Sequence, residues 1–168
     1  HLGIARIFQN PEVFNSFTVY ENINIGKKFG QQDKKIDLSV NEIIEFVDLS
    51  GKEKVMAGEL IVSDKKKLMI AVALATSPKL LLLDEPCAGL NVIESENIIS
   101  LIKELKEKFQ ITIILVEHNM KILMNISERV LILNEGKKLC EGPPGHVCSD
   151  EKVIERYLGS SMVEVHLK

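Results

Sequence analysis

Long apolar segments and a recognisable signal segment are both missing from this sequence. No apolar run approaches the roughly 20 residues that a helix needs to cross a bilayer. The chain opens with His1, Leu2 and Gly3, without an initiator Met and without a basic segment followed by an apolar one, so secretion is not supported. Internal repeats and low-complexity segments are missing too, which favours an ordinary globular chain.

Cysteine is scarce and the net charge is small. Cys87, Cys140 and Cys148 form an odd, scattered set without metal-ligand spacing, which is typical of reduced thiols in the cytosol. A disulfide between Cys140 and Cys148 is the alternative. The net charge of -3 gives no reason to expect nucleic acid or an anionic membrane as a partner. With 168 residues, of which 45% are hydrophobic, the chain is one domain or part of one.

The most informative stretch is residues 80–86, Leu-Leu-Leu-Leu-Asp-Glu-Pro. A short apolar run that ends in two acids predicts a strand of a parallel sheet, buried on both faces. Its carboxyl end lies where open α/β folds bind ligands. There Asp84 suits magnesium held through water, and Glu85 suits a general base. The alternative is a core strand followed by an acidic turn, in which Pro86 only ends the strand.

Two other segments predict strands that end near polar residues. Residues 4–8 read as a short strand followed by Gln9, and residues 111–116 as a second buried strand with His118 just beyond its end. A lone glutamine after a strand is usually a turn residue, and a lone histidine there is more often structural. These two side chains therefore need support from elsewhere in the sequence.

Helix signals occupy the segments between these strands. Thr18 with Glu21 has the spacing of a capping box, and Ser39 precedes apolar residues at helical spacing. Residues 65–76 are apolar nearly all round after their lysines, which predicts a buried helix. Residues 26–37 are polar, basic and rich in turn formers, which predicts a surface connection.

Taken together, these motifs resemble the ATP-binding-cassette (ABC) ATPases. Residues 80–86 resemble the Walker B strand of that family, and residues 88–91, Ala-Gly-Leu-Asn, stand where it has its D-loop. Residues 65–75 look like the helix after the signature motif, and residues 116–120 look like the switch-histidine loop. Residues 9–23 resemble the Q-loop and the segment after it. The resemblance implies an α/β fold, a partial P-loop NTPase (ABC ATPase) fold with a mostly parallel sheet, flanking helices and a helical subdomain.

The resemblance also implies roles for individual residues. Glu85 would be the general base, Asp84 the acid on the magnesium side, and Gln9 and His118 the residues that contact the γ-phosphate, the metal or the attacking water. ATP and Mg²⁺ would be the cofactors. Because such ATPases close as head-to-tail dimers around two nucleotides, a further group would serve the nucleotide site of the partner subunit. That group is Asn91, Ser63 and Asp64.

The sequence departs from the family at two motifs. An intact signature reads Leu-Ser-Gly-Gly-Gln, whereas residues 60–64 are Leu-Ile-Val-Ser-Asp; Ile61 removes a hydroxyl and Ser63 adds a Cβ. Val72 also stands where the family commonly has arginine. A P-loop needs Gly, four residues, Gly-Lys and then Ser or Thr, and none of the Gly-Lys pairs here has that context. We therefore expect an ABC ATPase that lacks its front part and has a degenerate signature.

The domain organisation and biological role also depend on the resemblance. It implies one partial ABC ATPase domain over residues 1–168, with a helical subdomain at about 12–77, the remaining nucleotide core at 78–150, and a C-terminal helix and tail at 151–168. The phrase at residues 153–159 resembles the end of ATP-binding subunits from branched-chain amino acid importers. Such a subunit lies on the cytoplasmic, inner face of the cell membrane.

Its partners would be transmembrane permease subunits and a second ATP-binding subunit, and no nucleic acid. The rival hypothesis is a non-catalytic module that docks on a permease or dimerises. A soluble ABC ATPase without a membrane partner is a third reading. The short chain argues against it, because such proteins usually carry two cassettes.

Overall fold

The computed structural model describes residues 2–30 and 36–155. Two compact units make up the chain, His1–His118 and Asn119–Lys168, and each is described by itself. The boundary between them falls inside the segment 78–150 that the sequence assigns to one nucleotide core. Residues 31–35 of the predicted surface connection and the C-terminal residues 156–168 lie outside the described residues.

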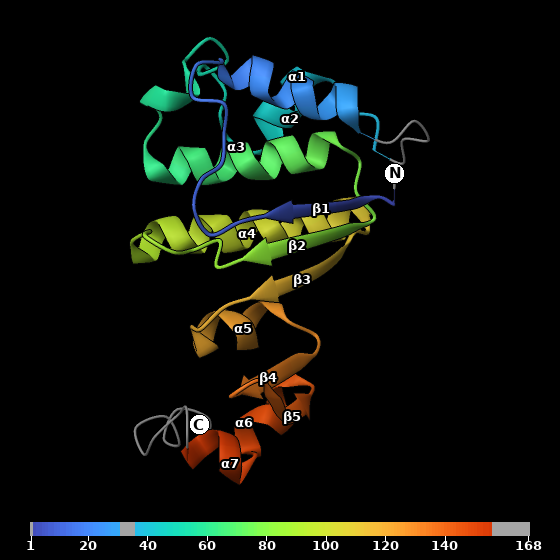
Figure 1. The fold of residues 1–168 in the computed structure, drawn as a ribbon, viewed down its shortest axis with the longest axis vertical. Helices are drawn as coiled ribbons and strands as arrows, with labels where there is room; N and C mark the ends of the chain where they lie inside the picture. The colour runs from blue at the N-terminus through green and yellow to red at the C-terminus, as the bar shows by residue number, and fades with distance from the viewer. Residues whose placement is uncertain (1, 31–35, 156–168) are drawn as a thin grey trace. The chain divides into compact units, whose positions relative to one another are not determined.

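A three-stranded parallel sheet forms the centre of the first unit (Figure 1). Its strands are β1 (Ile4–Ile7), β2 (Leu80–Asp84) and β3 (Thr112–Val116), in the order β1-β2-β3. Leu81 of β2 is in register with Ala5 of β1 and Ile113 of β3. The parallel sheet with flanking helices confirms the predicted fold class.

The prediction that β2 is buried on both faces was wrong, and so was the prediction that β3 is a buried strand. Leu81 and Leu83 of β2 are each 1% exposed, but Leu80 and Leu82, on the opposite face, are only half-buried. In β3, Ile114 is 53% and Val116 56% exposed. The long helix α4 (Val92–Phe109) lies across one face of the sheet in Figure 1. One face of β2 is therefore fully removed from water, whereas no residue of β3 is fully buried.

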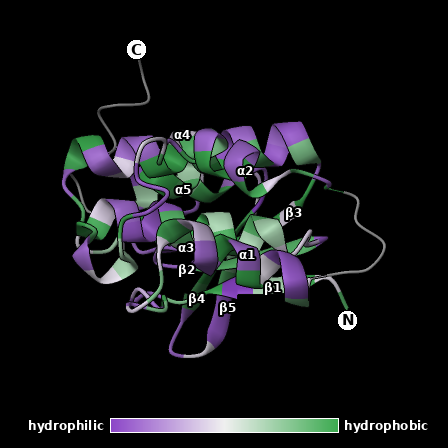
Figure 2. Cartoon of the chain, turned by 90° about the horizontal axis from the view of Figure 1, so that it is seen from above, coloured by the Kyte–Doolittle hydropathy of each residue, from purple (hydrophilic) through white to green (hydrophobic). Residues whose placement is uncertain are grey.

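Helices surround this sheet, and local capping determines where several of them begin. The first unit contains α1 (Val19–Phe29), α2 (Val40–Phe46), the 3-10 turn η1 (Ala57–Glu59), α3 (Val62–Ala75) and α4. Thr18 with Glu21 forms the predicted capping box of α1, and Ser39 is the N-cap of α2 as predicted. In Figure 2 the strands of the sheet are mainly green, while α4 alternates between purple and green, as an amphipathic helix does.

Helix α1 extends further than the sequence suggests. Residues 26–29, expected in a surface connection, form its last turn, and Gly26 is buried. The reason is a close approach between α1 and α3. A Cβ added at Gly26 would lie 2.6 Å from the main-chain oxygen of Val72 and 3.0 Å from Cβ of Ala75. The glycine lets the two helices pack, and this gain outweighs its low helix propensity.

We expect Gly26→Ala to destabilise the chain. A carbonyl 2.6 Å from the new Cβ cannot be accommodated without moving a helix. The net loss should be about 1–3 kcal/mol, despite the better helix propensity of alanine. Urea unfolding followed by circular dichroism measures it. Gly145→Ala is the control, since a Cβ there meets nothing within 4 Å, and its midpoint should stay or rise. Equal midpoints for the two variants would refute the role of Gly26 in helix packing.

The second unit is small and has its own core. It contains α5 (Met120–Ile126), β4 (Val130–Asn134), β5 (Lys137–Gly142), α6 (Pro144–Ser149) and α7 (Glu151–Val153). The strands β4 and β5 form a hairpin, and its turn residues Glu135 and Gly136 both have positive φ. The core consists of Val130, Ile132, Cys140, Val147 and Val153. Cys140 and Cys148 are free thiols, so the alternative of a disulfide between them is not realised.

Candidate active site

The carboxyl ends of the three parallel strands bring polar side chains from distant parts of the sequence together. Gln9 follows β1, Asp84 and Glu85 end β2, and His118 follows β3. In a parallel sheet these ends share one edge. The sequence-predicted catalytic residues therefore gather at one place, although they are separated by up to 109 residues, from 9 to 118.

Glu85 is at the centre of this group. Its Oε2 accepts a hydrogen bond from Nε2 of Gln9 at 2.6 Å, and its Oε1 lies 3.5 Å from Nδ1 of His118. The Glu85 side chain is half-buried, while that of His118 is largely exposed. A carboxylate held between an amide and an imidazole, and still open to water, can accept a proton from a water molecule.

The backbone at Glu85 is held in an unusual conformation. Its φ is 43°, in the left-handed region that residues with a Cβ rarely adopt. The Glu85 N–H donates to the main-chain oxygen of Val116 at 2.9 Å, which ties the residue to β3. Such conformations cost of order 1–3 kcal/mol and persist where the surrounding structure enforces them, often at functional sites.

Asp84 has a different partner, which the sequence analysis did not identify. Its Oδ2 lies 3.2 Å from Nη2 of Arg6 on β1, and the Arg6 guanidinium also stacks over the ring of Phe8, 4.2 Å from the centroid. Both charged side chains are more than one third exposed, so the ion pair contributes little to stability. The signal in the sequence was a charged residue in the middle of a short apolar strand.

Cys87 and Glu117 lie behind the acidic end of β2. The Cys87 N–H donates to Oε1 of Glu117 at 3.2 Å. Burial raises the pKa of the Cys87 thiol to about 11, and the charge of Glu117 adds to that shift. A thiol with so high a pKa is protonated and poorly nucleophilic at neutral pH, so Cys87 is a structural residue.

The remaining predicted site residues lie at the N-termini of α3 and α4. Asn91 is the N-cap of α4, where its side chain accepts from the N–H of Glu94 at 3.0 Å. Ser63 and Asp64 are buried in the first turn of α3, and Asp64 pairs with Lys52 at 2.5 Å. The residues exposed at this helix start are Ile61 and Val62. Ile61 is the N-cap and makes no side-chain capping bond.

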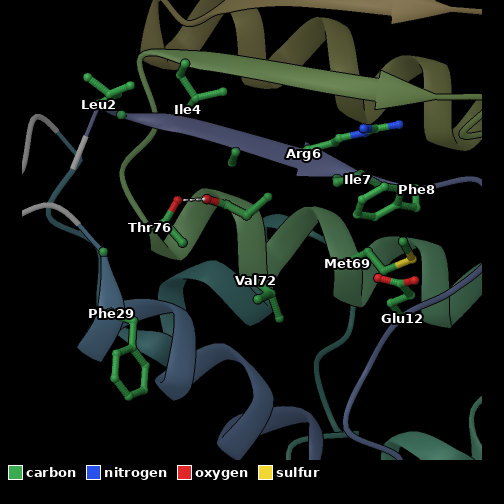
Figure 3. Close-up of a pocket in the computed structure, with 14 residues that line it drawn as sticks. Leu2, Ile4, Arg6, Ile7, Phe8, Glu12, Phe29, Met69, Val72 and Thr76 are labelled. Carbon is green, nitrogen blue, oxygen red and sulfur yellow. Dashed lines mark hydrogen bonds between the residues drawn. The ribbon is translucent and has the colours of Figure 1, made fainter.

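The structure also contains a cavity of about 330 Å³ between β1, α3 and the end of α1 (Figure 3). Figure 3 shows the apolar residues Phe29, Val72 and Met69 around it, together with the polar side chains of Arg6, Glu12 and Thr76. Val72, at the position where ABC ATPases commonly have arginine, is part of that wall. Among the described residues that line the cavity, none is Gln9, Glu85 or His118, but Arg6, the partner of Asp84, is one of them.

The group at the strand ends fits one part of a magnesium–nucleotide site. Magnesium is usually held by one or two protein oxygens, with waters and phosphates completing its octahedron. The Asp84 carboxylate and the amide oxygen of Gln9 would supply such oxygens if magnesium were bound there. In the described part of the chain, no three His, Cys, Asp or Glu side chains cluster as metal ligands. The motif that cradles phosphates in P-loop proteins does not occur in the 168 residues.

A parallel sheet with flanking helices, and with a glutamine, a glutamate and a histidine at its carboxyl edge, places the first unit in the open α/β class. The model of the family described as "ABC transporter" matches residues 1–88. The chain belongs to this family.

Similar proteins of known function agree with that assignment. The chain is 30% identical over 95% of its length to the high-affinity branched-chain amino acid transport ATP-binding protein BraF of Pseudomonas aeruginosa. It is 33% identical over 95% of its length to LivG of Escherichia coli, which carries the same description. In both comparisons it covers 69% of the relative.

A solved structure is similar as well. The ADP conformation of MJ1267, an ATP-binding cassette of an ABC transporter, matches with a TM-score of 0.76 and 34% identity, over 94% of this chain and 68% of that one. The chain thus spans about two thirds of the length of these relatives. Over the described residues, no helix is both long and apolar enough to cross a membrane.

Proposed function

We propose that the chain provides the general-base and γ-phosphate-contacting part of an ATP-hydrolysing ABC importer subunit. The observation that carries the proposal is the contact of Glu85 with Gln9 on one side and His118 on the other. ATP and Mg²⁺ are the ligands that membership of the family implies. Bound Mg²⁺ would neutralise phosphate charge beside Asp84.

In the proposed reaction, Glu85 accepts a proton from water while the water oxygen forms a bond to the terminal phosphorus. The bond from that phosphorus to the bridging oxygen breaks, and ADP leaves with the electron pair. Gln9 orients the Glu85 carboxylate, and His118 presents its imidazole to the transferred phosphoryl group. Each role rests on a side chain at the same edge of the sheet.

The transported substrate and the partners belong to the proposal as well. The descriptions of BraF and LivG support import of branched-chain amino acids. On this proposal the chain works on the cytoplasmic face of the membrane, docked on transmembrane permease subunits. A second ATP-binding subunit pairs with it head to tail. Asn91 at the start of α4, and the start of α3 where Ser63 and Asp64 are buried, would lie toward the nucleotide of that subunit.

A second candidate function has a specific observation in its favour. Ile61 is exposed at the start of α3, where the family has a serine hydroxyl. A module that docks on a permease or dimerises without hydrolysing ATP would not need that hydroxyl. Nucleotide binding and turnover distinguish the two functions.

The test compares the 168-residue chain with a hybrid in which a P-loop segment from a relative precedes it. We expect no measurable binding of Mg-ATP to the chain alone by calorimetry, because most phosphate contacts come from the P-loop. The hybrid should bind Mg-ATP and release phosphate. Binding by the hybrid without phosphate release would favour the non-catalytic module, and micromolar binding by the chain alone would contradict the need for a P-loop.

A further inference from the structure

Helix α3 carries a buried lysine that the proposed reaction does not use. Three consecutive lysines lie in its first half, and each ammonium group has a different partner. Lys65 donates to the main-chain oxygen of Gly58 at 3.2 Å, and Lys67 pairs with Asp48 at 2.7 Å. Lys66 is only 2% exposed and donates to the main-chain oxygen of Gln9.

Lys66 is a charged residue at a buried position, and its surroundings indicate that it does more than fill space there. Taking an ammonium group out of water is costly unless it is hydrogen-bonded and faces opposite charge. Lys66 donates a hydrogen bond to the main-chain oxygen of Gln9. Burial lowers the pKa of its ammonium group, and the charges of Glu117 and Glu85 act in the opposite direction. From Leu68 onward the buried residues of α3 are apolar. An apolar side chain would fill the position of Lys66 at lower cost if packing alone were required.

We propose that Lys66 is a positioning residue for the candidate site, which holds the main chain of Gln9 so that its side-chain amide reaches Glu85. Gln9 lies beyond the end of β1, where sheet hydrogen bonds no longer fix the chain. The bond from Lys66 supplies a fixed point on that segment. The Gln9 side chain then spans to Oε2 of Glu85, 2.6 Å from its Nε2.

The same contact links two motifs of the family within one subunit. Lys66 lies four residues after Val62, the first residue of α3, so a shift of this helix would be transmitted to the Gln9 carbonyl. The catalytic importance of this contact rests on the proposed function. The contacts of Lys66 with Gln9 and of Gln9 with Glu85 can be tested without nucleotide.

The test uses nuclear magnetic resonance of the 168-residue chain. Lys66→Met keeps the aliphatic stem and removes the ammonium group, and Lys65→Met is the matched control on the same helix. We expect Lys66→Met to shift the Gln9 carbonyl and side-chain amide signals. Hydrogen exchange of the Gln9 side-chain amide should become about ten- to a hundredfold faster, because the amide would lose its hydrogen bond to the charged Glu85 carboxylate. Lys65→Met should leave both signals in place, and Lys66→Arg should restore them in part.

Unchanged Gln9 signals in Lys66→Met, or equal shifts in the Lys65 control, would overturn the inference. If Lys66→Met does not fold, the contact can still be tested in the unsubstituted chain. Nuclear Overhauser contacts between the Lys66 ε protons and Gln9 are required, and their absence rejects the proposal. Phosphate release by the hybrid is a separate measurement, so failure of the proposed function is distinguishable from failure of this positioning role.

Discussion

Glu85→Gln should bind Mg-ATP normally but hydrolyse it about 10²- to 10⁴-fold more slowly when placed in the hybrid with a P-loop segment. Glutamine preserves the shape of the side chain and can still contact Gln9 and His118. It cannot accept the proton of the attacking water. Binding is measured by calorimetry, and turnover by phosphate release under saturating ATP.

The control for this experiment is Glu96→Gln, on an exposed position of α4. It removes the same charge from the same subunit and should leave turnover unchanged. If Glu85→Gln turns over as fast as the unsubstituted hybrid, Glu85 is not the base. If Glu85→Gln instead loses ATP binding, Glu85 contributes to binding the ground state of the nucleotide rather than to the chemical step alone.

Ile61→Ser is expected to act on both stability and turnover. Ile61 is the N-cap of α3, its main-chain oxygen already accepts from the N–H of Lys65 at 3.0 Å, and its side chain is 62% exposed. A serine with the same backbone can bond to a free N–H of the first turn, which should stabilise the chain by about 0.5–2 kcal/mol. In the hybrid, the returned hydroxyl should also raise hydrolysis at low ATP, by up to about ten- to a hundredfold.

Val62→Ser is the matched control for this variant. Val62 is also exposed, but it is the first helical residue of α3 and not its cap. Val62→Ser should raise neither the stability of the chain nor the rate of hydrolysis. If Ile61→Ser raises the unfolding midpoint and leaves hydrolysis flat, the serine caps the helix but does not reach a nucleotide. The role proposed for this end of α3 in the partner site would then be wrong.

Local patterns in the sequence predicted the elements that depend on neighbouring residues. The leucine run of β2 with Asp84 and Glu85 at its end and the helix caps at Thr18 and Ser39 are examples. A capping box needs only two residues three positions apart. The strand needs only an apolar run that ends in polar residues. The resemblance to ABC ATPases added Gln9 and His118, which no local rule selects.

The sequence by itself therefore determined the kind of sheet, the positions of its strands and the identity of the acids at its edge. The tertiary structure alone decided which faces of β2 and β3 are buried, that α1 continues past Gly26, and that Lys66 and Arg6 contact the site. These features depend on pairs of residues far apart in the chain: Gly26 against Val72, Arg6 against Asp84, and Lys66 against Gln9. A single sequence does not reveal such contacts, because burial and charge pairing arise only after the chain has packed.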